Sequence, residues 1–205
     1  MPRGTLFIVT APSGAGKTSL VKALVDHDQQ LSVSISHTTR AQRPGEIDGI
    51  NYHFVSKEKY VDMLGKGDFL ESADVYGNHY GTSEAQVKLL LDSGINVILE
   101  IDWQGASHVR NLHPEACSIF ILPPSLDSLK ARLTGRGQDD VETINRRMDQ
   151  AVAEISHVAE ADFIVVNDDF NTALEDIRAV IRSRQLTVGS QRLNLSQLLD
   201  TLTQS

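Results

Sequence analysis

APSGAGKT, residues 11–18, is the stretch of this sequence that decides the fold. It matches the P-loop pattern of two spaced glycines followed by lysine and a hydroxyl residue, except that Ala11 replaces the first glycine. Small residues let successive backbone N–H groups surround phosphate oxygens, and the start of a helix adds its positive end. Lys17 would reach the β- and γ-phosphates of a nucleotide, and the Thr18 hydroxyl would bind Mg²⁺. The whole loop is therefore predicted to bind nucleotide phosphates: Ala11, Pro12, Ser13, Gly14, Ala15, Gly16, Lys17 and Thr18.

The surroundings of this loop are those that a P-loop requires. Residues 5–11 form a short apolar run, and Leu20, Ala23 and Leu24 recur at helical spacing after the loop. Compact apolar runs, typical of parallel strands covered on both faces, alternate with helical patterns further along the chain. We predict an α/β fold with a P-loop parallel sheet covered by helices. Its further strands are expected at 96–102, 117–122 and 162–167, and its helices at 84–91, 126–133, 141 to about 158, and over the leucines near 195–202.

Composition narrows the class of protein. The net charge of −8 argues against a general nucleic-acid-binding surface. The single cysteine, Cys117, lies in an apolar run and is expected to pack in the core of a protein from a reducing compartment. No apolar run approaches the ~18 residues of a membrane span, and the N-terminal apolar run lacks a signal-peptide cleavage site. We expect a cytoplasmic protein with neither nucleic acid nor membrane as a partner.

A carboxylate for the metal is expected at the end of a strand beside the P-loop. Glu100 and Asp102 both belong to the strand-like run 96–102, and their spacing of two places them on one face. A carboxylate pair inside an apolar strand is costly without partners, which favours a functional role over two charges exposed to water.

A second phosphate site is suggested by residues 36–52. Arg40 and Arg43 follow hydroxyl residues and precede Tyr52. Guanidinium groups bind phosphate oxygens in a bidentate manner. From these residues alone, a solvated loop explains the stretch equally well.

Six segments together resemble the guanylate kinase family in order and spacing. They are APSGAGKT, SISHTTRAQRPGEIDGINYHFV (34–55), FLESADVYGNHYGT (69–82), ILEIDWQGA (98–106), RLTGRG (132–137) and FIVVND (163–168). The resemblance extends from about Leu6 to Ile181. It implies an enzyme that moves the γ-phosphate of ATP to GMP, with dGMP as an expected second acceptor and Mg²⁺ accompanying ATP. It also implies a single domain, 1–205, whose core is about 1–33, 84–125 and 154–205, with a GMP-binding insertion at about 34–83 and a lid at about 126–153.

The resemblance also assigns roles to individual residues of this chain. The GMP phosphate would be held by Arg40, Arg43, Tyr52 and Tyr80, and guanine would be read by Ser36, Glu71, Thr82 and Asp102. On the ATP side, Lys17, Arg136 and Arg147 would be catalytic, Arg132 would be a further contact, and Asn167 would lie near adenine. Thr18 and Glu100 would hold the metal. Small departures from the family pattern are His37 where serine is frequent, Glu100 where aspartate also occurs, and Thr82 where serine also occurs.

The chemistry of Glu71 agrees with a role in reading guanine. Guanine offers two adjacent donors, N1–H and the 2-amino group, and an ionised carboxylate can accept from both. Adenine presents an acceptor at N1, which the carboxylate would repel. The alternative from the residues alone is an outward-pointing charge on a hairpin strand, because Phe69 and Leu70 precede Glu71.

Three other functions share parts of these patterns. A guanylate-kinase-like protein-binding module would keep the fold without the phosphate chemistry, but the P-loop is intact through Lys17 and Thr18. A P-loop GTPase would carry an Asn-Lys-x-Asp motif, which the sequence lacks. A kinase for AMP conflicts with Glu71. The sequence leaves open whether the chain forms a homo-oligomer.

Overall fold

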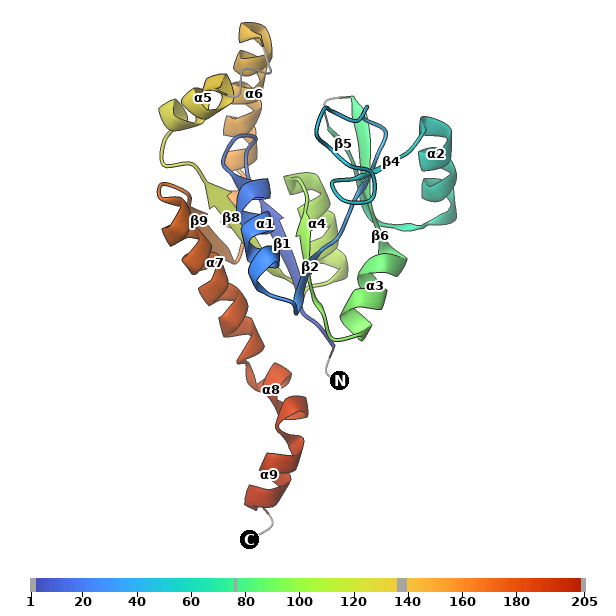
Figure 1. The fold of residues 1–205 in the computed structure, drawn as a ribbon, viewed down its shortest axis with the longest axis vertical. Helices are drawn as coiled ribbons and strands as arrows, with labels where there is room; N and C mark the ends of the chain where they lie inside the picture. The colour runs from blue at the N-terminus through green and yellow to red at the C-terminus, as the bar shows by residue number, and fades with distance from the viewer. Residues whose placement is uncertain (1–2, 76, 136–139, 204–205) are drawn as a thin grey trace.

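The computed structural model describes residues 3–75, 77–135 and 140–203, and its centre is a five-stranded parallel sheet (Figure 1). The strand order is β2-β7-β1-β8-β9, so the strand before the P-loop is central. Leu6 pairs with Val97 on one side of β1, and Phe7 pairs with Cys117 on the other. The strands are β1 (Leu6–Thr10), β2 (Leu31–Val33), β7 (Asn96–Glu100), β8 (Cys117–Leu122) and β9 (Phe163–Val166).

Alternating side chains of these strands build two separate cores. Phe7 and Val9 point to one face, where they pack with α1 (Lys17–His27) and α7 (Phe170–Gln185). Leu6 and Ile8 point to the other, where they pack with α3 (Glu84–Asp92) and α4 (Trp103–Leu112). Burial on both faces explains why these strands are continuous apolar runs. The predicted α/β fold with a helix-covered parallel sheet is confirmed.

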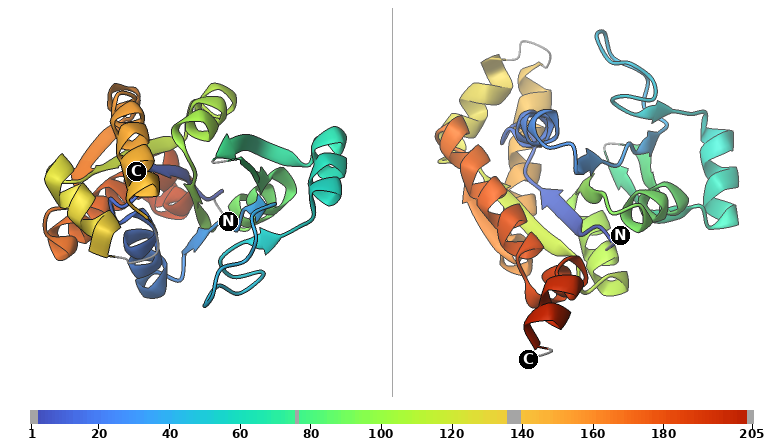
Figure 2. Two further views of the ribbon diagram at one scale, coloured as in Figure 1. Left: turned by 90° about the horizontal axis from the view of Figure 1, so that it is seen from above. Right: turned by 60° about the horizontal axis from the view of Figure 1, so that its bottom comes forward.

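A second, smaller sheet lies within residues 34–83. Its order is β4-β3-β6-β5, formed by β3 (His37–Thr38), β4 (His53–Phe54), β5 (Phe69–Val75) and β6 (Asn78–Ser83). Helix α2 (Lys57–Lys66) begins after Ser56, whose side chain caps the Lys59 amide, and the Tyr60 hydroxyl donates to the Tyr80 carbonyl at 2.6 Å. This segment stands beside the main sheet (Figure 2). Side chains from both parts line the cavity described below.

Two helices cover the P-loop from the other side. Helices α5 (Leu126–Gly135) and α6 (Val141–Ile155) share a small core of their own, and the turn η1 (Val158–Glu160) follows. Leu129 and Leu133 of α5 also approach Gly14 so closely that a Cβ there would lie 3.0–3.1 Å from them. Helix α5 thus lies directly against the P-loop. The core that α5 and α6 share consists of Leu129, Leu133, Ile144, Met148 and Ala151.

The C-terminal segment forms two helices, where the sequence predicts one. Helices α8 (Val188–Asn194) and α9 (Ser196–Thr203) extend away from the body of the molecule (Figure 1). The leucines at 195, 198, 199 and 202 are exposed along them. In the described part of the chain, no helix is both long and apolar enough to cross a membrane.

Candidate active site

The P-loop connects β1 to α1, and its backbone requires glycine twice. Gly14 and Gly16 both have φ of 95°, in the left-handed region that disfavours side chains. A Cβ on Gly16 would also lie 2.3 Å from the Asn167 side-chain nitrogen. That nitrogen donates to the Ala15 carbonyl at 2.7 Å, so Asn167 holds the loop from behind.

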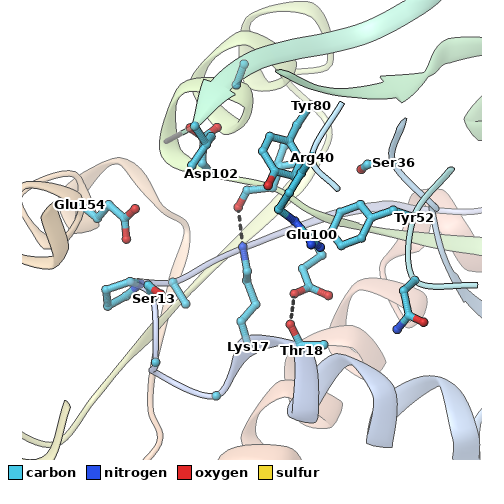
Figure 3. A pocket seen from close by; sticks show the side chains of 18 of the residues that line it. Ser13, Lys17, Thr18, Ser36, Arg40, Tyr52, Tyr80, Glu100, Asp102 and Glu154 are labelled. Atoms are coloured by element: carbon cyan, nitrogen blue, oxygen red, sulfur yellow. Dashed lines mark hydrogen bonds between the residues drawn. The ribbon is translucent and has the colours of Figure 1, made fainter. Parts of the chain in front are cut away.

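The loop opens into a cavity of about 360 Å³, which lies within the size range of small-molecule sites. Its walls come from the P-loop, the small sheet, the end of β7 and helix α6 (Figure 3). Sequence-predicted residues that line it are Ala11, Pro12, Ser13, Gly14, Gly16, Lys17, Thr18, Ser36, Arg40, Arg43, Tyr52, Glu71, Tyr80, Glu100, Asp102 and Arg147.

Four predicted site residues lie outside the cavity wall, and one lies outside the described residues. Ala15 is fully buried in the loop, and Thr82 is buried behind Glu71. Arg132 donates to the Asn167 carbonyl at 2.9 Å, so these two predicted ATP contacts hold each other. Arg136 lies outside the part of the chain that the structure describes.

Lys17, Thr18 and Glu100 meet at the phosphate end of the cavity. The Lys17 ammonium donates to the Ile101 carbonyl at 2.9 Å, and the Thr18 hydroxyl donates to the Glu100 carboxylate (Figure 3). Hydroxyl and carboxylate oxygens are the donors that Mg²⁺ prefers, and enzymes of this type complete its shell with phosphates and water. Thr18 and Glu100 therefore suit the predicted metal.

Asp102 differs from the sequence expectation in its backbone setting. Strand β7 ends at Glu100, and Asp102 caps helix α4 by accepting from the Gly105 amide at 2.9 Å. Glu100 and Asp102 therefore line the same cavity from a strand end and a helix start rather than from one strand face.

Arg40 is held in place by a residue that sequence reasoning missed. The two Glu46 oxygens accept from the Arg40 guanidinium and from the Arg43 amide, each at 2.7 Å. Burial lowers the pKa of Arg40, but the hydrogen bond and charge of Glu46 outweigh it and raise that pKa. The guanidinium also lies 5.4 Å from the centre of the Tyr52 ring. An acidic residue three positions after Arg43 in a Pro-Gly turn was the available signal.

Tyr52 and Tyr80 stand beside this arginine. Their ring centres are 5.8 Å apart in an edge-on arrangement. Burial, and then the Glu100 charge, raise the pKa of Tyr52 to about 12. Its phenol therefore stays protonated and can donate to an anion.

Glu71 points inward and is only 3% exposed, which removes the alternative of an outward strand charge. It accepts from the Thr82 hydroxyl at 2.5 Å, and Thr82 in turn lies 3.3 Å from the Ser36 hydroxyl. Burial is the main reason that the pKa of Glu71 rises to about 7. The Thr82 hydrogen bond lowers this pKa, and the Asp102 charge raises it further. A carboxylate held this way gains strongly from a ligand that offers it donors.

The raised pKa of Glu71 makes stability depend on pH. The folded protein keeps a proton that the unfolded chain releases above pH 4.5, so this stabilisation is complete below pH 4.5 and is lost as pH rises through 7. We expect Glu71→Gln to gain about 2–3 kcal/mol more in unfolding free energy over wild type at pH 8 than at pH 5. Urea unfolding at both pH values measures this. The exposed Asp176→Asn is the control, and an equal gain at both pH values for Glu71→Gln would show that the carboxylate titrates normally.

Gly105 determines how closely α4 approaches Glu71. A Cβ on Gly105 would lie 2.6 Å from the nearer Glu71 carboxylate oxygen and 3.3 Å from an Asp102 oxygen. The atom in the way is the end of a side chain, so Gly105→Ala should fold while displacing the carboxylate.

For GMP, the acceptor that the sequence resemblance implies, we expect Gly105→Ala to raise the KM tenfold or more. Thermal stability should not fall, since alanine favours a helix by up to ~1 kcal/mol over glycine. Gly65→Ala in α2 is the matched control, because a Cβ there meets nothing within 4 Å. Steady-state kinetics and thermal melts of both variants measure the two effects. If Gly105→Ala and Gly65→Ala change the KM for GMP equally, the close approach of Gly105 to Glu71 does not affect GMP binding.

A second acidic residue missed by sequence reasoning is Glu154. It belongs to α6 and lines the cavity together with Arg147, seven residues before it on the same helix. Burial raises the pKa of Glu154, while the Lys17 charge and the Ser13 amide lower it. The spacing of Arg147, Ala151 and Glu154 along one side of a helix was the signal in the sequence.

Comparisons with known proteins agree with this geometry. A family model described as guanylate kinase matches residues 3–184. The chain is 57% identical over 199 residues to a guanylate kinase of Pseudomonas fluorescens, covering 97% of each, and 53% identical over 200 residues to one of Methylobacillus flagellatus, covering 98% and 99%. A crystal structure of guanylate kinase from Anaplasma phagocytophilum superposes with a TM-score of 0.78 at 29% identity, covering 92% of this chain and 90% of that one.

Proposed function

The chain belongs to the guanylate kinase family, and we propose that GMP and ATP meet in the cavity between its P-loop and its small sheet. Members of this family transfer the γ-phosphate of ATP to GMP, and that reaction is the activity of this chain. The observation that carries the placement is that one cavity is lined by Lys17 and by the buried Glu71. The Lys17 ammonium suits a phosphate, and the Glu71 carboxylate suits the hydrogen-bond donors on the edge of a purine.

On the ATP side, the P-loop amides and Lys17 bind the β- and γ-phosphates. The Lys17 ammonium, which donates to the Ile101 carbonyl, would then turn toward the phosphates. Thr18 and Glu100 would hold Mg²⁺, which would supply positive charge to the phosphate oxygens. Asn167 and Arg132 keep the loop in shape from behind.

On the GMP side, Arg40, Arg43 and the two tyrosines bind the phosphate. Arg40 keeps N–H groups beyond those bonded to Glu46 and Ala41, because a guanidinium has five donors. Glu71 accepts from guanine, with Ser36, Thr82 and Asp102 around it. The attacking group is an ionised phosphate oxygen, so the reaction needs no dedicated general base, and no side chain of the cavity is assigned that role.

Closure of the lid completes the site. Arg147 of α6 already lines the cavity, and Arg136 belongs to the connection after α5. Cations that arrive on closure neutralise the two anionic substrates and stabilise the transferring group more than the ground state. We further propose dGMP as an acceptor and a cytoplasmic location, which agree with a nucleotide-recycling enzyme.

The test is ADP formation from ATP and Mg²⁺ with GMP, dGMP, AMP, CMP and UMP in turn. Rapid turnover with GMP and dGMP alone supports the proposed site. Turnover with AMP at a similar kcat/KM would show that the cavity does not read the guanine edge. Failure with every acceptor would favour a protein-binding role for the fold.

A further inference from the structure

Glu154 places a carboxylate at the phosphate end of the cavity, and the mechanism above does not use it. The residue is the penultimate one of lid helix α6 and lines the cavity with Pro12, Ser13 and Lys17. Figure 3 shows its side chain directed from α6 toward the P-loop and Lys17. A negative charge thus stands where the phosphates of a nucleotide are expected.

The surroundings of Glu154 compensate its charge only in part. Its Oε2 is buried and accepts no hydrogen bond within the described residues. The charged groups that face it from neighbouring elements are Lys17 of α1 and Asp102 at the start of α4, and the Ser13 amide also faces it. The Lys17 ammonium donates to the Ile101 carbonyl and forms no ion pair with Glu154 in the described structure. Such a buried, incompletely bonded carboxylate is costly to maintain, which argues against a purely structural role.

P-loop amides and a P-loop lysine form a site that attracts anions. Glu154 is an anion that helix α6 presents to this site. ATP phosphates that enter bring a larger negative charge next to the carboxylate, and the two repel each other because little water separates them.

We propose that Glu154 is a resident anion of the ATP phosphate site, which weakens ATP binding by repelling the phosphates. This inference rests on the proposed function, because it requires ATP phosphates at Lys17. Arg147, two helical turns earlier on α6, brings the opposite charge to the same cavity. The lid helix therefore carries both a group that opposes the phosphates and a group that attracts them.

The inference predicts a gain in affinity when the charge is removed. Calorimetric titration without GMP should show that Glu154→Gln binds Mg·ATP about fivefold or more tightly than wild type, as for the removal of a nearby, partly desolvated like charge. Mg·ADP should gain less, since it lacks the γ-phosphate. Asp149→Asn is the matched control: it removes the same charge from an exposed position of α6 and should change ATP affinity less than twofold.

Lys17→Ala separates this inference from the proposed function. If Lys17→Ala weakens ATP binding while Glu154→Gln leaves it unchanged or weakens it, the ATP site is supported and the resident-anion role is overturned. If ATP affinity is the same in Lys17→Ala and wild type, the proposed phosphate site itself is wrong. Glu154→Asp, which draws the carboxylate back by one methylene, should show a smaller gain in the same direction. A lost or reversed effect there would also contradict the inference.

Discussion

Lys17→Ala should lower kcat by about 10²–10³-fold while leaving the fold and the thermal transition intact. Loss of one preorganised charge at a site of developing negative charge costs about 3–4 kcal/mol of transition-state stabilisation. In the structure, the Lys17 ammonium makes one hydrogen bond to the protein, to the Ile101 carbonyl, and its side chain lines the cavity. Its removal therefore leaves one carbonyl to be solvated and opens no void in either core.

The measurement is single-turnover transfer from ATP to GMP, with circular dichroism to verify folding. Lys22→Ala on the exposed side of the same helix is the control for charge and helix content, and should keep wild-type turnover. Near-normal transfer in a folded Lys17→Ala protein would contradict the mechanism, because no other lysine lines the cavity within the described residues.

The main sheet and its P-loop could be predicted because local and global signals coincide there. The apolar run before residue 11, the glycines that need positive φ, and the helical spacing after Lys17 all indicate the same strand–loop–helix unit. The structure places β1 and α1 within one residue of that expectation.

Among the helices that escaped prediction, α4 and α7 did so for different reasons. Helix α4 has few apolar residues, and its buried side consists of Gly105, Ala106 and Val109. The apolar spacing along this segment is therefore too weak to indicate a helix. Helix α7 carries Ala173, Ile177 and Ile181 at a regular helical spacing after an Asp169 cap, a signal that the sequence did contain.

Some residues of the candidate site could be predicted from local sequence motifs, whereas others depend on tertiary contacts. Residues within compact motifs, such as Arg40 and Glu71, were named from the sequence, and the structure brings both to one cavity. The contribution of Glu46 depends on a turn that folds it back onto Arg40, and that of Glu154 depends on how α6 lies on the P-loop. The spacing of Glu46 and of Glu154 in the sequence makes them candidates, but tertiary packing determines the contacts that they make.

Wild-type enzyme should prefer GMP over AMP by roughly 10²–10⁴-fold in kcat/KM, and Glu71 should be the main cause. Hydrogen bonds to a charged group contribute about 1.5–3 kcal/mol each, and guanine offers two donors to this carboxylate. The carboxylate is 3% exposed, so a base without those donors leaves it in a poorly solvated position. Inosine monophosphate, which keeps N1–H and lacks the 2-amino group, should fall between the two.

Glu71→Gln should collapse this preference mainly through loss of GMP. Its amide NH₂ would face a donor of guanine, while the Thr82 hydroxyl can still donate to the remaining oxygen. AMP should change little, because the arginines and tyrosines that bind its phosphate do not depend on the charge at residue 71. The measurement is kcat/KM for all three monophosphates on wild type and variant, at a pH above 7, where the carboxylate of the wild type is ionised. The buried position predicts that the ordering of the three bases is lost; if the variant keeps the wild-type ordering and spacing, guanine is read elsewhere in the cavity.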